Sequence, residues 1–238
     1  MKTEENMQQL KLFGMIRMWQ SLKENRQHHG LNLEEGLDIL LQAEKQDRDN
    51  KRKDRLEKVA GFRYQASIEE ISYLSGRGID KNTLLSLTDC QFITNGESIL
   101  ITGPTGAGKS FIASAFGHQA CQMGYKVAYY SMHKLFLKLK LFRADGSIVR
   151  FFDRLNKQQL LILDDFGLNR LDQQQRMDLM EIIEDRHNRK STIIASQLPV
   201  ASWYEIIGDD TIADAIMDRI IHGSHRIELA GESLRKKM

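Results

Sequence analysis

The sequence predicts an α/β fold with a mainly parallel sheet flanked by helices, plus a small all-α N-terminal domain. From residue 97 onwards, short apolar runs alternate with helix-forming segments, which is the pattern of repeated β-α units. Leu160–Leu163 is a continuous apolar run, as expected for a strand buried on both faces. Residues 1–65 instead carry apolar side chains at helical spacing.

Composition limits the class of protein. The 238 residues are 41% hydrophobic, which suits one or two domains with a substantial core. No apolar run reaches the roughly 18 residues of a membrane span, and no signal core follows Met1, so we expect a cytoplasmic protein without a membrane partner. Cys90 and Cys121 have no metal-binding spacing and fit a reducing compartment. The net charge of +2 neither favours nor excludes nucleic acid.

The N-terminal domain, residues 1–65, ends in a charged helix. A first helix is expected through Leu10–Leu22, and Asn32 with Glu35 forms a capping box for a second. Eight Lys/Arg and four acids then lie between Lys45 and Arg63. This run is either a solvated face laced with i,i+4 pairs or a helix that follows a DNA backbone. In the second case the contacts would be Lys51, Arg52, Lys53 and Arg55.

The remaining chain, residues 66–238, divides into a connector (66–96) and a core (97–238). In the connector, Ser67 with Glu70 predicts a short helix over 68–74, and Asp80 predicts another over 81–87. In the core, strands are expected at 98–102, 126–131, 160–163, 191–196 and 225–229. Helices are expected at 109–123, 133–142, 147–156, 172–189 and 211–221, with a short one capped by Ser202.

A glycine-rich loop follows the first core strand and opens a helix. It reads Gly103, Pro104, Thr105, Gly106, Ala107, Gly108, Lys109, Ser110. This is the G-x-x-x-x-G-K-[ST] phosphate loop in its strand–loop–helix context, which makes a chance glycine turn a poor alternative. Backbone N–H groups and the helix dipole would cradle a polyphosphate, Lys109 would reach its β/γ oxygens, and Ser110 would complete a Mg²⁺ shell. The loop therefore predicts ATP with Mg²⁺ as cofactors.

Two carboxylates emerge from the buried strand at Leu160–Leu163. We expect Asp164 to hold Mg²⁺, largely through water, and Asp165 to polarise the attacking water. They lie at the carboxyl edge of the sheet, where ligands bind in open α/β folds.

Further candidates come later in the chain. Ser196 and Gln197 end the next strand, where a γ-phosphate sensor would lie. Arg219 and Arg235 could stabilise transition-state charge, from the same or a neighbouring subunit. Alternatively, Arg219 forms a surface ion pair, for instance with Asp218 or Asp214.

With these elements in place, the sequence resembles IstB-type transposition helper ATPases, AAA+ proteins related to the DnaC and DnaI helicase loaders. Besides the loop and the Asp pair, the resemblance rests on segments 76–80, 208–216, 218–220 and 231–235, and it covers nearly the whole chain. It implies an AAA+ P-loop NTPase core, ATP-dependent homo-oligomers that grip double-stranded DNA, and a cognate transposase as partner. It also implies sensor one at Ser196 and Gln197, the trans-acting arginine finger near Arg219, and sensor two at Arg235. Many AAA+ proteins have Glu in place of Asp165, so the resemblance implies slow hydrolysis.

Two other functions stay open at this point. A helicase loader would bind a protein ring and single-stranded DNA through the same architecture. A small-molecule phosphotransferase could use the same phosphate loop, although no acceptor-binding lid is evident.

Overall fold

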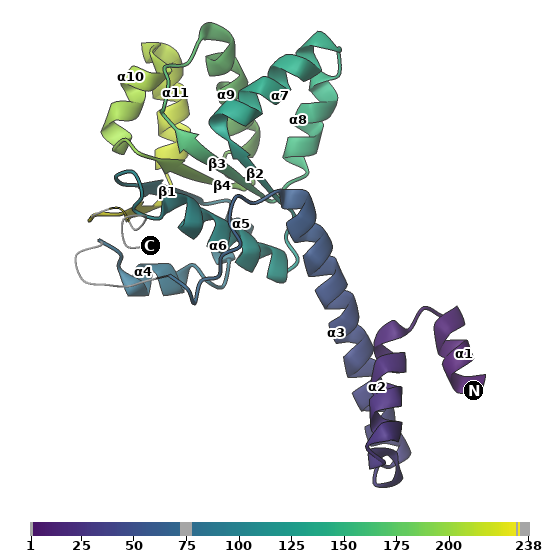
Figure 1. The fold of residues 1–238 in the computed structure, drawn as a ribbon. Helices are drawn as coiled ribbons and strands as arrows, with labels where there is room; N and C mark the ends of the chain where they lie inside the picture. The colour runs from purple at the N-terminus through teal and green to yellow at the C-terminus, as the bar shows by residue number, and fades with distance from the viewer. Residues whose placement is uncertain (1, 72–77, 232, 234–238) are drawn as a thin grey trace. The chain divides into compact units, whose positions relative to one another are not determined.

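The computed structural model describes residues 2–71, 78–231 and 233 (Figure 1). By its contacts the chain forms two compact units, Met1–Arg55 and Leu56–Met238. The boundary lies inside one continuous helix, α3 (Leu33–Ala60), whose residues contribute to both units.

The N-terminal unit contains α1 (Lys2–Gln9), α2 (Phe13–Glu24), the short η1 (Gln27–His29) and the first part of α3. The single helix expected through Leu10–Leu22 is corrected: the chain turns between α1 and α2, and Lys11 takes a left-handed φ of 58°. The predicted capping box at the start of α3 is confirmed. The backbone N–H of Asn32 donates to Glu35, and that of Glu35 donates to Asn32.

Helices α2 and α3 pack at close range. A Cβ at Gly14 would lie 2.5 Å from the carbonyl oxygen of Ala43, so only glycine allows this approach. The buried Glu44 then accepts hydrogen bonds from the backbone N–H groups of Gly14 (2.8 Å) and Met15 (3.3 Å). Its carboxylate thereby satisfies N–H groups in the first turn of α2, which have no partner within that helix. Met7, Met15, Leu22 and Leu40 form the small core of the unit.

The second unit is built on one five-stranded parallel sheet. Its strands are β1 (Ser98–Thr102), β2 (Val127–Ser131), β3 (Leu160–Phe166), β4 (Ser191–Ser196) and β5 (Ser224–Glu228). They lie in the order β2-β3-β4-β1-β5, and every neighbouring pair is parallel. The predicted parallel sheet is confirmed. Because all strands run the same way, their carboxyl ends meet at one edge.

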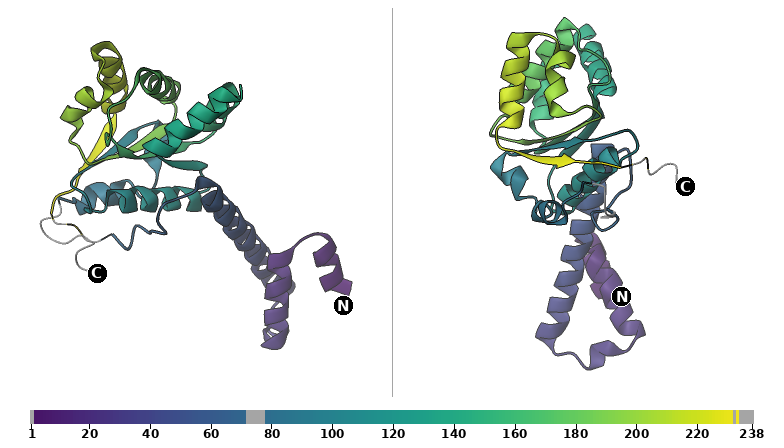
Figure 2. Two further views of the ribbon diagram at one scale, coloured as in Figure 1. Left: turned by 45° about the horizontal axis from the view of Figure 1, so that its top comes forward. Right: turned by 90° about the vertical axis from the view of Figure 1, so that its left-hand side faces the viewer.

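Helices cover both faces of the sheet (Figure 1), and the two helical layers are seen again in Figure 2. One face carries α4 (Lys81–Ser86), α5 (Gln91–Asn95) and α6 (Lys109–Gln122). The other carries α7 (Met132–Ala144), α8 (Ile148–Asn156), α9 (Gln173–Arg186), η2 (Val200–Ser202), α10 (Trp203–Ile207) and α11 (Asp210–Ile221). Side chains alternate between the two cores along each strand: Ile99 and Ile101 pack with α6, whereas Leu100 packs on the opposite side.

The connector contributes to the core beside α6. Asp80 caps α4 as predicted, accepting from Asn82 and Thr83. The helix predicted over 68–74 is replaced by a bend and turn at 68–70, and the rest of that range lies outside the described residues. Helix α5 was not foreseen; its Phe92 and Ile93 pack under the sheet. In the part of the chain that the structure describes, no helix has the length and apolarity to cross a bilayer.

Candidate functional site: a phosphate loop and an aspartate pair at the sheet edge

The phosphate loop has the backbone that its glycines permit. Gly103, Gly106 and Gly108 have φ values of 144°, 81° and 98°, all in the region that disfavours side chains. A Cβ at Gly103 would also lie 2.4 Å from the carbonyl oxygen of Leu229, where the chain leaves β5. Helix α6 begins at Lys109 directly after the loop, so its positive end faces the loop.

Lys109 is held over the loop. Lys109 is only 8% exposed, and its ammonium donates to the carbonyl oxygens of Gly103 (2.8 Å) and Pro104 (2.9 Å). The loop thus places one cation beside its own backbone, at the start of α6. That combination suits a polyphosphate.

The aspartate pair lies on a bulge of β3. The predicted strand end at residue 163 is corrected, because β3 continues to Phe166. The register with β4 shifts between Leu163 and Phe166, and Asp165 between them takes a left-handed φ of 60°. A bulge redirects side chains at the end of a strand, and Asp is among the few residues that tolerate this φ. Both carboxylates therefore reach the edge next to the loop.

Asp164 is buried and accepts several hydrogen bonds. Its side chain is 1% exposed and accepts from the hydroxyl of Ser110 (3.0 Å), the hydroxyl of Tyr129 and the backbone N–H of Asp165 (2.9 Å). Burial, together with the charge of Asp164, raises the pKa of Tyr129 strongly, so this phenol stays a neutral donor.

The same atoms suit a magnesium ion. Ser110 and Asp164 offer hard oxygen donors side by side, and Mg²⁺ usually takes few protein ligands with the rest supplied by waters and phosphates. No group of three or more His, Cys, Asp or Glu with metal-binding geometry occurs among the described residues. These residues therefore suit a metal ion that also binds a phosphate, and not one held by protein ligands alone.

The two polar residues at the end of β4 have different surroundings. Gln197 accepts a 2.6 Å hydrogen bond at Oε1 from the hydroxyl of Thr105, within the phosphate loop. The hydroxyl of Ser196 instead donates to the carbonyl of Phe166 (2.8 Å) and accepts from the N–H of Leu198 (3.1 Å), and its side chain is 1% exposed. Strand β4 lies between β1 and β3, so Gln197 stands between the loop and the aspartate pair.

Arg219 lies at the other edge of the sheet. It is in the last turn of α11 and lines a small crevice with Ser98 and Lys190, at the amino ends of β1 and β4. It pairs with Glu184, not with the Asp218 or Asp214 weighed from the sequence, and donates to the carbonyl of Ala215 (2.9 Å). The phosphate loop of the same chain lies at the opposite edge, at the carboxyl ends of the strands. Arg235 lies outside the described residues.

The basic residues proposed for DNA differ in their contacts. Lys51 pairs with Asp47 (2.7 Å) and lies 4.7 Å above the ring of Phe13, so it contributes to the packing of the N-terminal unit. Arg52 and Arg55 are exposed on the surface of α3, and Lys53 is half-buried.

Sequence reasoning missed two basic features. Residues 132–157, which form α7 and α8, hold seven Lys/Arg against two acids. All seven are exposed: Arg143 pairs with Asp178, and the other six are Lys134, Lys138, Lys140, Arg150, Arg154 and Lys157. A count of charge along the core would have found this cluster. The second feature is Arg63, whose guanidinium lies 3.0 Å from Asp165 and 3.4 Å from Asp164. No local pattern links it to residues a hundred positions away.

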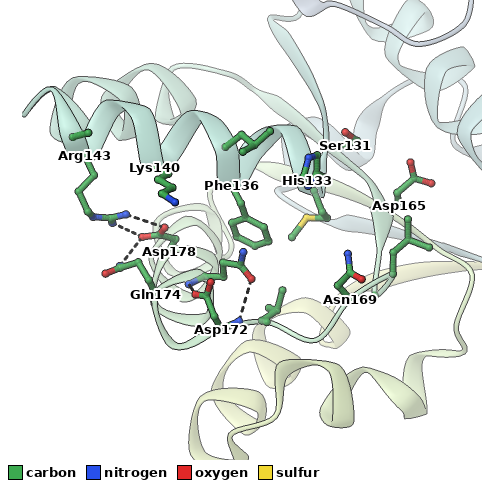
Figure 3. A pocket seen from close by; sticks show the side chains of 17 residues that line it. Ser131, His133, Phe136, Lys140, Arg143, Asp165, Asn169, Asp172, Gln174 and Asp178 are labelled. Atoms are coloured by element: carbon green, nitrogen blue, oxygen red, sulfur yellow. Dashed lines mark hydrogen bonds and ion pairs between the residues drawn. The ribbon is translucent and has the colours of Figure 1, made fainter.

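A separate cleft of about 650 Å³ begins at Asp165 and runs between α7 and the segment that joins β3 to α9. Figure 3 shows Asp165 at one end and the ion pair of Arg143 with Asp178 at the other. None of residues 103–110 is among its described lining. This mostly apolar hollow is therefore separate from the phosphate loop.

The sequence model described as IstB-like ATP binding protein matches residues 5–238. The chain belongs to that family. A putative insertion sequence ATP-binding protein of Sinorhizobium fredii is 44% identical over 235 residues, 98% of this chain and 96% of the relative.

This IstB-like protein is also similar in fold to the DnaC helicase loader, with a TM-score of 0.54, 20% identity, and coverage of 74% of this chain and 98% of that one. The replication initiator DnaA bound to AMPPCP and single-stranded DNA gives a TM-score of 0.57 at 22% identity, covering 70% of this chain and 50% of that chain. The predicted fold of the core is confirmed by these two likenesses and by its parallel sheet.

Proposed function

We propose that this IstB-like protein is a Mg²⁺-dependent ATPase that serves DNA transposition as a helper. One observation carries the proposal: the phosphate loop, the aspartate pair and Gln197 meet at one sheet edge in a chain of an insertion-sequence ATP-binding family. Acting for an insertion sequence requires contact with DNA and with the transposase that cuts and joins it. A phosphotransferase acting on a small molecule would not explain the family.

Each site residue has a distinct task in hydrolysis. The loop N–H groups and Lys109 bind the β- and γ-phosphates and hold them in line for attack. Ser110 and Asp164 would hold magnesium, which neutralises charge on the phosphate oxygens. Asp165 orients the attacking water and draws its proton. Gln197, tethered to Thr105, is poised to contact the γ-phosphate and to respond to its loss.

The position of Arg219 supports assembly of several copies. An arginine at the amino edge of the sheet is remote from its own phosphate loop, so a role in catalysis requires a neighbouring subunit. We propose that Arg219 is supplied in trans, as arginine fingers are. For Arg235, which lies outside the described residues, we propose the second arginine role that stabilises charge on the phosphates.

Contact with duplex DNA is proposed for two basic surfaces. One is the surface of α3, with the exposed Arg52 and Arg55 and the half-buried Lys53. The other is the surface of residues 132–157, with the six Lys/Arg other than Arg143 named above. Clustered cations of this kind follow a phosphate backbone without reading its sequence.

The experiment is a binding and sizing assay on the full chain. Purified protein is titrated with a fluorescent ATP analogue and Mg²⁺, then sized with a nonhydrolysable analogue and duplex DNA. We expect nucleotide-dependent assembly on DNA, lost in Lys109→Ala and kept in the control Arg170→Gln, whose side chain is exposed outside both basic surfaces. No measurable affinity for ATP with Mg²⁺ would overturn the proposal. Capture of a replicative helicase but not of a transposase would select the helicase-loader alternative.

A further inference from the structure

The side chain of Arg63 contacts both carboxylates of the aspartate pair. One guanidinium nitrogen of Arg63, Nη1, lies 3.0 Å from Oδ2 of Asp165 and 3.4 Å from Oδ2 of Asp164. The Arg63 side chain is 41% exposed, whereas Asp164 is 1% exposed. A guanidinium therefore reaches in from solvent and bridges the two side chains that the proposed mechanism gives to magnesium and to the attacking water.

The backbone on either side of Arg63 is anchored. The ring of Phe62 packs on that of His118 with 4.2 Å between centroids, and Nε2 of His118 donates to the carbonyl of Tyr64 (3.1 Å). Nδ1 of the same imidazole lies 3.2 Å from Glu57. Phe62 can approach because residue 117 is glycine, where a Cβ would lie 2.3 Å from the ring. The clamp fixes the residues that flank Arg63 and leaves its long side chain to reorient.

A guanidinium and a hydrated divalent cation are drawn to the same carboxylate oxygens. Arg63 contacts Oδ2 of Asp164 and Oδ2 of Asp165, so a divalent cation attracted by the charge of this pair must compete with the guanidinium. We propose that Arg63 is a positioning residue that competes with Mg²⁺ for Asp164 and Asp165, and that it swings out when magnesium nucleotide is loaded. This rests on the proposed function of the site. While Arg63 bridges the pair, it neutralises Asp165 and stands where the attacking water must be oriented.

The test measures how much magnesium nucleotide binding requires. A fluorescent ATP analogue at fixed concentration is titrated with MgCl₂ for the natural protein, Arg63→Gln, Arg63→Lys and the control Arg170→Gln, whose side chain is exposed on the β3–α9 segment. We expect Arg63→Gln to reach half-maximal binding at about fivefold lower Mg²⁺, the scale of removing one partly exposed ion pair. Arg63→Lys should reach half-maximal binding at an intermediate Mg²⁺ concentration, because the compact ammonium of Lys bridges two carboxylates less well than a guanidinium does. Arg170→Gln should match the natural protein.

A second measurement needs no nucleotide. In EDTA, Arg63→Gln should melt at a lower temperature than the natural protein, because two neighbouring carboxylates lose their shared cation. Added Mg²⁺ should raise the melting temperature of Arg63→Gln by more than it raises that of the natural protein. If Arg63→Gln needs as much Mg²⁺ as the natural protein, the proposal fails while the proposed function stands. If Arg63→Gln weakens binding of the ATP analogue at saturating Mg²⁺, Arg63 contacts the phosphates and the proposal also fails. If the natural protein does not bind the analogue, the proposed function itself fails.

Discussion

The hydroxyl of Thr105 donates a 2.6 Å hydrogen bond to Oε1 of Gln197, joining the phosphate loop after β1 to the end of β4 across 92 positions of sequence. The neighbouring Ser196 turns its hydroxyl into the backbone of Phe166 and Leu198. Two adjacent polar residues thus make separable contributions, one to the site and one to the fold.

Replacing Gln197 with Ala should slow ATP hydrolysis by about 100- to 1000-fold, the range for losing one positioned hydrogen-bond donor, with ATP affinity nearly unchanged. Ser196→Ala should instead lower the free energy of unfolding by about 1 kcal/mol, because two buried hydrogen bonds are lost. Steady-state hydrolysis and thermal melts of both variants make the comparison. Equal loss of hydrolysis without loss of stability in Ser196→Ala would show that Ser196 also acts at the site.

Asp165→Asn should keep ATP binding and reduce hydrolysis by on the order of 100-fold or more, because an amide cannot take the proton of the attacking water. Asn adopts the left-handed φ of 60° found at this position, so the backbone of the bulge should be kept. Asp165→Ala is expected to add a loss of stability, since Ala disfavours that conformation. A melting temperature for Asp165→Asn far below that of the natural protein would contradict this separation.

Arg219→Ala should bind ATP but hydrolyse it poorly. The sharper test mixes two inactive variants: Asp165→Asn, which binds ATP and keeps Arg219, and Arg219→Ala, which keeps its own Asp165. If the arginine acts in trans, the mixture should recover hydrolysis that neither variant has alone. Glu184→Gln serves as control for loss of the Arg219 ion pair. No recovery over a range of mixing ratios would argue against a shared site.

DNA affinity should fall, and its salt dependence flatten, in two variants. One replaces Arg52, Lys53 and Arg55 with Ala and retains Lys51, because Lys51 pairs with Asp47 and its loss would perturb packing. The other replaces Lys134, Lys138, Arg150 and Arg154. Each lost phosphate contact should reduce the slope of log K against log salt by about 0.9 for duplex DNA. Fluorescence anisotropy over a salt series measures this, with Arg189→Ala as a single-charge control. An unchanged slope would show that the surface in question is only solvated.

Glu44 should make the stability of the N-terminal unit depend on pH. Burial opposes its charged form, but hydrogen bonds from Arg48, Met15 and Gly14 outweigh burial and hold the pKa of Glu44 below its usual value of 4.5. Because the folded pKa is the lower one, this stabilisation is fully present above pH 4.5 and is lost as pH falls through the folded value.

Glu44→Gln should therefore cost about 1–3 kcal/mol at pH 7, where a charged acceptor of buried N–H groups is removed. The difference from the natural protein should shrink as the pH is lowered below 4.5. Denaturant unfolding of the full chain, followed by far-UV circular dichroism, measures both. Glu34→Gln, exposed on the same helix, is the control and should change little at either pH.

Local pattern in the sequence determined the phosphate loop, the parallel sheet and the two carboxylates after Leu163. Those features depend on short-range rules: glycines for positive φ, apolar runs for buried strands, and caps for helices. Only the tertiary structure decided which distant side chains meet them. The strand order puts Gln197 between the loop and Asp165, turns Ser196 into the backbone, sends Arg219 to the far edge and brings Arg63 onto the aspartate pair. Strand order and bulges arise from packing between residues far apart in the chain, and no periodicity within a segment encodes them.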